Sequence, residues 1–236
     1  MKASVFFTHQ EVAGPKLRGQ TAVVIDVLRA TSTIVAALDA GAAAIHPVVS
    51  VADAVRLATS LGRGEALLAG ERGGRRIEGF HLGNSPGEFT AECVHAKRVV
   101  MSTTNGTAAL VTASAAQRTV VASLVNLSAV AAEVAAAERL AVVCAGHAGR
   151  FSMDDALCAG MLLRRLSERV PALKLDDSGQ AALALAGSFE VDADFLLRCA
   201  WGAVLAGLGR EDDVRWCAQV DALDLVPEFS DGLIRR

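Results

Sequence analysis

Short apolar runs alternate with amphipathic stretches along most of this chain. The apolar runs are rich in Val, Ile and Ala, and β-branched residues in short runs favour strands over helices. They predict strands at residues 4–8, 21–27, 44–49, 66–69, 98–102, 119–122 and 140–144. Between them the apolar positions follow the helical period, which predicts a helix in most of the intervals.

Capping and breaking residues set the predicted helix ends. Ser50 is suited to N-cap a helix over 50–61, and Ser85 followed by Pro86 is suited to open another. Further helices are predicted at 32–40, after residue 107, from Asn126, and at 153–170. Residues 177–219 read as mostly helical, with breaks at Gly187 and at 207–209, and 224–227 as an added edge strand.

This alternation predicts an α/β fold with a mainly parallel sheet and helices on both faces, in three layers. No composition shift marks a boundary, so residues 1–236 are expected to form one domain, or two intimate subdomains.

The composition narrows the function classes. Hydrophobic residues make up 52% of the chain and the net charge is −3, so there is no basic excess for nucleic acid. The apolar runs are too short for a membrane span or a secretory signal, and we expect a cytoplasmic protein. The five cysteines have no metal-binding spacing and are expected to be reduced. Most of them, with the two Trp residues, are predicted to lie in the core.

A polar cluster follows the second predicted strand. It contains Asp26, Arg29, Thr31, Ser32 and Thr33. Ligands of open parallel sheets bind at the carboxyl ends of strands, so these side chains are candidates for a binding site. The structural alternative is a helix capped by one of the three hydroxyls, with Asp26 paired to Arg29.

Three more predicted strands end in polar clusters, at 70–74, 103–107 and 144–155. Four such clusters at one edge of a sheet predict a single composite site. The stretch from Thr103 to Thr107 precedes a helix and contains Gly106, which suits a phosphate cradle. The alternative is a helix cap at Asn105.

Acidic residues occur in three of these clusters. Asp26, Glu71, Asp154 and Asp155 are hard oxygen ligands of the kind that Mg²⁺ prefers. For Asp154 and Asp155 the alternative is stabilisation of a helix N-terminus.

Cys144 and Arg150 are six residues apart between a predicted strand and a helix, as in cysteine-dependent phosphatases. Val143 stands where tyrosine phosphatases have His. A buried structural Cys is the alternative.

Several motifs taken together resemble the 2-phosphosulfolactate phosphatase family. They are DVLRATST, GERGG, GF-x-LGNSP, TTNGT and CAG-x-x-G-x-x-S-x-D-D, in family order over residues 20–160. The resemblance implies an α/β fold that is particular to this family. It also implies Mg²⁺-dependent release of phosphate from phosphosulfolactate, on the route to coenzyme M.

The sequence and the resemblance together predict roles for particular residues. Asp26, Glu71 and Asp155 are the catalytic candidates. The predicted metal ligands are Asp26, Glu71, Asp154 and Asp155, and the predicted substrate-binding residues are Arg29, Thr31, Ser32, Thr104, Asn105, Gly106, Thr107 and Arg150. Arg29 or Arg150 would bind the sulfonate or carboxylate. The glycine-rich segment 72–88 is predicted to cover the site, and the apolar C-terminal helices predict a homodimer.

Overall fold

The computed structural model describes all residues of the chain except 13 and 63. Its described strands form one sheet, mostly parallel, in the order β5-β4-β6-β3-β11-β10-β7-β2-β8-β1-β9. In chain order they are β1 Lys2–Phe6, β2 Thr21–Ile25, β3 Ala44–Pro47, β4 Ala66–Arg72, β5 Arg75–Arg76, β6 Arg98–Ser102, β7 Arg118–Ala122, β8 Arg139–Cys144, β9 Lys174–Leu175, β10 Glu228–Ser230 and β11 Leu233–Arg235.

Helices connect most of the strands. They are α1 Ala30–Asp39, α2 Val51–Leu61, α3 Ala91–Val94, α4 Gly106–Ala113, α5 Leu127–Val134, α6 Met153–Arg169, α7 Asp177–Ser188, α8 Ala193–Arg198, α9 Ala200–Gly207 and α10 Glu211–Cys217. Short 3-10 helices occur at η1 His9–Glu11, η2 Gly14–Leu17, η3 Pro86–Glu88 and η4 Leu124–Asn126. Among the described residues, no helix combines the length and apolar character that a bilayer crossing requires.

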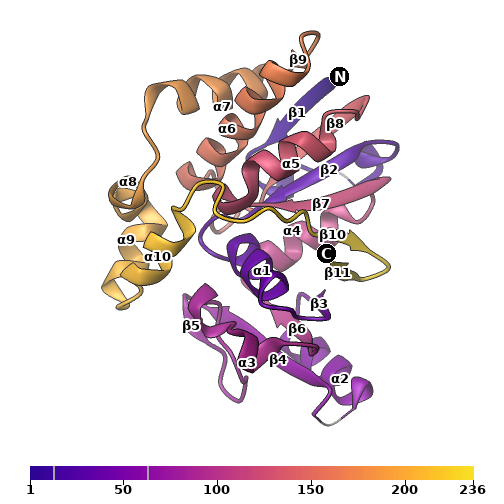
Figure 1. The fold of residues 1–236 in the computed structure, drawn as a ribbon, viewed down its shortest axis with the longest axis vertical. Helices are drawn as coiled ribbons and strands as arrows, with labels where there is room; N and C mark the ends of the chain where they lie inside the picture. The colour runs from indigo at the N-terminus through magenta and orange to yellow at the C-terminus, as the bar shows by residue number, and fades with distance from the viewer. Residues whose placement is uncertain (13, 63) are drawn as a thin grey trace.

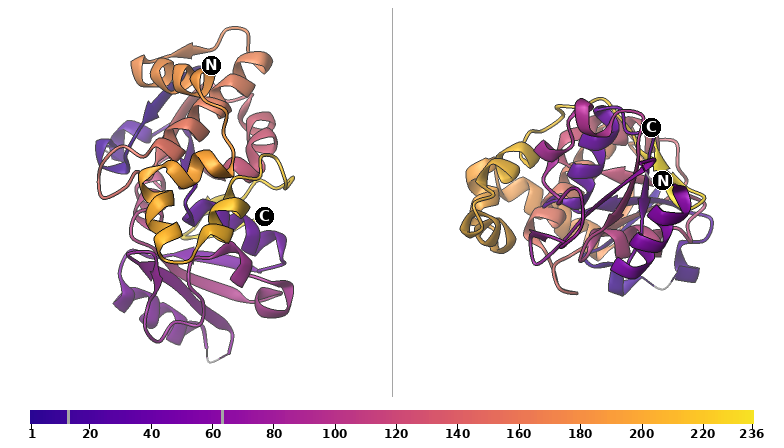
Figure 2. Two further views of the ribbon diagram at one scale, coloured as in Figure 1. Left: turned by 90° about the vertical axis from the view of Figure 1, so that its left-hand side faces the viewer. Right: turned by 90° about the horizontal axis from the view of Figure 1, so that it is seen from below.

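The sheet is covered on both faces, as predicted. Alternate residues of β2 point to opposite sides: Val24 packs in the core beneath α1 and α4, and Val23 in the core beneath α5 and α6. This alternation follows from the period of two in a strand. Figure 1 shows β1, β8, β2 and β7 in the upper half of the molecule and β3, β6 and β4 in the lower half, with α8, α9 and α10 at one side. In the left view of Figure 2 these three helices lie across the middle.

The C-terminal segment differs from its prediction. The strand expected at 224–227 is wrong: the segment forms a hairpin at 228–235 instead. This hairpin lies inside the sheet, between β3 and β7, and not at an edge. The predicted break at Gly187 is also misplaced, because α7 continues to Ser188. The break at 207–209 is confirmed.

Two element boundaries affect the site. Helix α1 begins at Ala30, two residues before the predicted start, and β4 continues to Arg72, three residues past the predicted end. Glu71 therefore lies within a strand and not in a loop. Ser50 caps α2 as expected, through a bond from the Asp53 amide. Ser85 precedes η3, but its side chain makes no capping bond.

Candidate active site

The four predicted polar clusters meet around a cavity of about 260 Å³. All four polar clusters contribute to it. Its lining residues are Asp26, Leu28, Arg29, Glu71, Gly73, Asn84, Thr103, Thr104, Asn105, His147 and Trp201. The clusters meet because β2 runs parallel to β8, and β4 runs parallel to β6.

Asp26 lies in the turn between β2 and α1. Its Oδ1 accepts a hydrogen bond from the Ala30 amide at 3.0 Å. The first backbone amide of α1 is therefore bonded to this carboxylate and not to one of the hydroxyls predicted as caps. A Cβ placed on Gly106 would lie 2.6 Å from Asp26 Oδ2, which puts the carboxylate directly against the start of α4. The pKa of Asp26 is raised to about 7, chiefly by burial; the charges of Asp154 and Glu71 contribute to this rise, and the hydrogen bond from the Ala30 amide opposes it.

The three hydroxyls after Arg29 are buried and bonded to backbone. Thr31 donates to the Asp26 carbonyl (2.8 Å), Ser32 to the Val27 carbonyl (2.7 Å) and Thr33 to the Asn84 carbonyl (3.1 Å). None of the three lines the cavity. Thr31 and Ser32, predicted to contact substrate, are placed where they shape the turn that presents Asp26.

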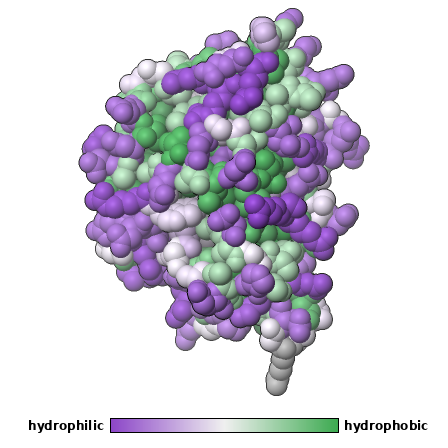
Figure 3. Space-filling view, in the orientation of Figure 1, coloured by the Kyte–Doolittle hydropathy of each residue, from purple (hydrophilic) through white to green (hydrophobic). Residues whose placement is uncertain are grey.

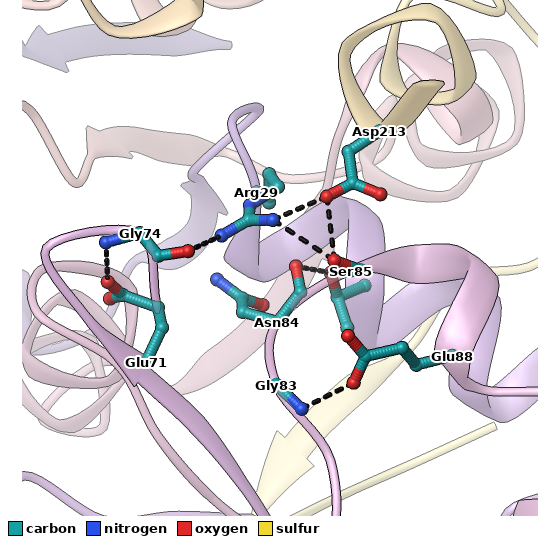
Figure 4. A network of polar contacts seen from close by, with 9 residues as sticks. Arg29, Glu71, Gly74, Gly83, Asn84, Ser85, Glu88 and Asp213 are labelled. Atoms are coloured by element: carbon teal, nitrogen blue, oxygen red, sulfur yellow. Dashed lines mark hydrogen bonds and ion pairs between the residues drawn. The ribbon is translucent and has the colours of Figure 1, made fainter. Parts of the chain in front are cut away.

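Arg29 is paired with Asp213 and not with Asp26. Its Nη1 lies 2.5 Å from Asp213 Oδ2, and its Nη2 donates to the Gly74 carbonyl at 3.0 Å. Figure 4 shows this network, which joins the turn after β2 to α10. Arg150, the other predicted guanidinium, is exposed and lies in a neighbouring groove.

Glu71 holds two loops together. Its Oε2 accepts from the Gly74 amide and its Oε1 from the Thr104 amide, both at 2.8 Å. Both carboxylate oxygens therefore have a backbone donor. Glu71 fixes the turn between β4 and β5 against the loop that follows β6.

The loop after β6 presents two backbone amides. Thr107 donates its amide to Thr103 Oγ1 (3.1 Å), and Thr104 donates its amide to Glu71. Within the described part of the chain, the amides of Asn105 and Gly106 have no acceptor. Asn105 precedes α4 as predicted but makes no side-chain cap bond. Free amides at a helix N-terminus favour an anion.

The other two acids lie in the first turn of α6. Asp155 accepts from the Val27 amide (2.9 Å) and the Gly146 amide (3.0 Å), so it joins the strand ends of β2 and β8. Burial raises its pKa well above the usual range, and repulsion from Asp154 and Asp26 adds to this. Asp154 accepts from the Ser152 hydroxyl, and burial raises its pKa as well. Both also lie where a helix dipole favours negative charge.

An open groove of about 530 Å³ adjoins the cavity. It contains Arg150 and Asp154, and it shares His147 and Trp201 with the cavity. These two rings stack with centroids 4.5 Å apart and form the wall between the two spaces.

The predicted four-carboxylate ligand set is not assembled around one point. Among the described residues, no group of three or more His, Cys, Asp or Glu side chains could hold a metal ion. Mg²⁺, however, usually takes one or two carboxylates and completes its shell with water and phosphate oxygens. Asp26 Oδ2 has no hydrogen-bond partner among the described residues, and neighbouring acids repel its ionised form. A cation would relieve that repulsion, so the donor set fits Mg²⁺ in this way.

Cys144 has the properties of a structural cysteine. It is fully buried at the end of β8 and does not line the cavity. Burial raises the pKa of its thiol well above the usual value, and the charge of Asp155 raises it further. A nucleophilic thiolate needs the opposite shift.

Two cavity residues were missed or misplaced by the sequence analysis. Trp201 was predicted to lie in the core, but it is half-buried and lines the cavity. Asn84 was seen only as part of a motif; it is 5% exposed, and its Oδ1 has no partner among the described residues. Segment 72–88 contributes Gly73 and Asn84 to the lining of the cavity. Buried Phe80 and Leu82 anchor this segment, and its movement as a cover stays a prediction.

Comparison with known proteins supports the resemblance over the whole chain. A family model described as 2-phosphosulpholactate phosphatase matches residues 6–232. A "probable 2-phosphosulfolactate phosphatase" of Caldanaerobacter subterraneus is 36% identical over 100% of this chain and 98% of its own length. A protein of the same name from Clostridium perfringens is 40% identical over 100% of this chain and 96% of its own length. A protein of the same name from Symbiobacterium thermophilum is 39% identical over 93% of this chain and 95% of its own length.

Proposed function

Because the chain belongs to the 2-phosphosulfolactate phosphatase family, a family of phosphoric monoester hydrolases, we propose that it hydrolyses a small anionic phosphate monoester with the help of Mg²⁺. The substrate that the relatives' names favour is 2-phosphosulfolactate, which would give sulfolactate and phosphate, a step of the coenzyme M type. The observation that carries the proposal is the position of Asp26 against Gly106, where a carboxylate meets the start of a helix.

The amides of Asn105 and Gly106 are the proposed phosphate cradle. They begin α4, where the helix dipole favours an anion, and they are the two amides of that loop without an acceptor among the described residues. Thr104 and Thr107 contribute by holding the loop, because their amides are bonded to Glu71 and Thr103.

Asp26, which lines the cavity, is the first proposed metal ligand. Asp154, which borders the adjoining groove and whose charge acts on Asp26, is the second, and Glu71 and Asp155 orient the loops around them. This division rests on their contacts: both oxygens of Glu71 and of Asp155 accept backbone amides. When bound, Mg²⁺ would neutralise phosphate oxygens and lower the pKa of a water molecule. A carboxylate beside a phosphate otherwise repels it, which disfavours the alternative that the chain binds a phosphometabolite without hydrolysis.

Two experiments test the proposal against its alternatives. Phosphate release from a panel of small phosphate esters, with and without Mg²⁺, separates an enzyme from a binding protein. In the thiol alternative Cys144 attacks phosphorus and Arg150 binds the phosphoryl oxygens. We expect exhaustive chelation to abolish turnover and Cys144→Ser to retain substantial turnover. Activity that survives chelation but is lost in Cys144→Ser would establish the thiol mechanism instead.

A homodimer is also proposed, with α7, α8 and α9 contributing. Phe189, which directly follows α7, and Val204 in α9 expose 42% and 46% of their surface. Figure 3 shows that hydrophobic patches alternate with hydrophilic residues on one face of the molecule. Light scattering over a concentration series should give twice 24.4 kDa, and a constant single-chain mass would end this proposal. The cytoplasmic location stays a prediction.

A further inference from the structure

The Arg29 guanidinium is held by three segments that are far apart in the sequence. Besides Asp213 and the Gly74 carbonyl, it contacts Ser85 Oγ at 3.2 Å. Ser85 Oγ in turn donates to the same Asp213 oxygen at 2.7 Å. Figure 4 shows Asp213 reaching this network from α10.

The pair is buried, since Arg29 is 3% exposed and Asp213 9%. Taking two charges out of water costs several kcal/mol, and well-packed apolar residues are often as stable as a buried pair. Stability alone is therefore a weak reason for an arginine here. Its place on the cavity wall is a stronger one.

Two of the five N–H donors of Arg29 remain available. Nη1 serves Ser85 and Asp213, and Nη2 serves Gly74, so Nε and the second hydrogen of Nη2 have no partner among the described residues. A guanidinium with two free donors can bind two oxygens of one carboxylate or sulfonate. The bonds to Asp213, Ser85 and Gly74 fix the orientation of the planar guanidinium.

From this arrangement we infer that Asp213 is a positioning residue, which orients Arg29 so that its free donors bind the second anionic group of the substrate, the one that is not the phosphate. The inference rests on the proposed function and selects Arg29 over Arg150. It also gives α10 a role in substrate recognition, although Asp213 lies 184 residues from Arg29 in the chain.

The test compares two substrates that differ in that second group. 2-Phosphoglycolate carries a carboxylate beside its phosphate, and glycerol 2-phosphate carries none. Asp213→Asn keeps an oxygen that can accept from Arg29 and Ser85 but removes the charge. We expect its KM for 2-phosphoglycolate to rise about tenfold, with kcat within threefold and the KM for glycerol 2-phosphate unchanged, because a neutral amide holds the Arg29 guanidinium less firmly than a charge-assisted bond does.

Asp212→Asn is the matched control, because Asp212 is the exposed neighbour on the same helix. It should leave both KM values unchanged. Equal changes for both substrates in Asp213→Asn, or no change for either, would overturn the inference. If Asp213→Asn does not fold, Ser85→Ala, which removes the hydroxyl shared by Arg29 and Asp213, decides the same comparison. If the unaltered protein hydrolyses neither ester, the proposed function fails, and calorimetric binding of 2-phosphoglycolate to both proteins still tests Asp213.

Discussion

Gly106 allows the polar cluster after β6 to contact the polar cluster after β2. A Cβ at this position would lie 2.4 Å from Ala30 Cβ and 2.6 Å from Asp26 Oδ2. Both distances are well below normal contact between heavy atoms of about 3.5–4.0 Å. The glycine therefore lets α4 begin against Asp26, and a methyl group would separate them.

We predict that Gly106→Ala lowers kcat/KM for phosphate release by about 100-fold, since displacement of reacting groups by about 1 Å can cost that much. Gly207→Ala is the control, because nothing lies within 4 Å of a Cβ there and α9 already holds that residue in a helix. Circular dichroism should show that both variants are folded. A Gly106→Ala variant with activity within threefold of the original would contradict this account of the contact.

Residue types predicted which segments line the cavity better than they predicted the contacts of each side chain. Asp26, Glu71 and the loop after β6 do meet in the cavity, and their placement at the carboxyl ends of strands was enough to foresee this. The hydrogen-bond partners could not be foreseen, because they come from distant segments. Glu71 accepts a hydrogen bond from the amide of Thr104, 33 residues away. Arg29 donates to Asp213, 184 residues away.

At the scale of elements, α9 determines the extent of the cavity. Its Trp201 stacks on His147, and the pair separates the cavity from the groove that contains Arg150. The groove is lined largely by apolar groups, including Phe151 and Met153. This wall therefore limits the length of the substrate on that side.

We predict that Trp201→Ala shifts specificity toward longer esters. The ratio of kcat/KM for para-nitrophenyl phosphate to that for 2-phosphoglycolate should rise about tenfold, the order of effect that one or two added groups have in an apolar pocket. Val204→Ala, an exposed position on the same helix, should leave the ratio unchanged. An unchanged ratio in Trp201→Ala, in a protein that still turns over 2-phosphoglycolate, would show that the wall does not set specificity.

Elements defined by local pattern were predicted well, and elements defined by tertiary pairing were not. The helix at 153–169 and the strand at 98–102 follow from periodicity alone. The hairpin at 228–235 has short strands with little pattern. Its Asp231-Gly232 turn, with both residues at positive φ, is the signal that could have identified it.

At the scale of the whole molecule, this hairpin joins the two parts of the sheet. β11 pairs with β3 and β10 pairs with β7, so the strands at 44–102 and those around β2 become one sheet. The cavity draws Glu71 and Thr104 from the first part and Asp26 and His147 from the second. The stability of the whole fold and the integrity of the site are therefore linked.

The buried acids link stability to pH in a direction that can be calculated. Burial raises the pKa values of Asp26, Asp154 and Asp155 in the folded protein, to about 7 for Asp26, against an unfolded value near 3.8. Between these values the folded state binds more protons than the unfolded state, so stability falls as pH rises from about 4 to about 7. A divalent cation bound at the cluster would favour the ionised carboxylates and oppose this loss.

We therefore predict that the melting temperature in chelator falls between pH 5 and pH 8, and that Mg²⁺ raises it more at pH 8 than at pH 5. Each kcal/mol corresponds to about 2–4 °C for a chain of this size. Asp26→Asn keeps an oxygen for the Ala30 amide but cannot ionise, so its melting temperature should fall less with pH and respond less to Mg²⁺. Equal stabilisation by Mg²⁺ at both pH values, or an unaltered response in Asp26→Asn, would place the cation away from this cluster.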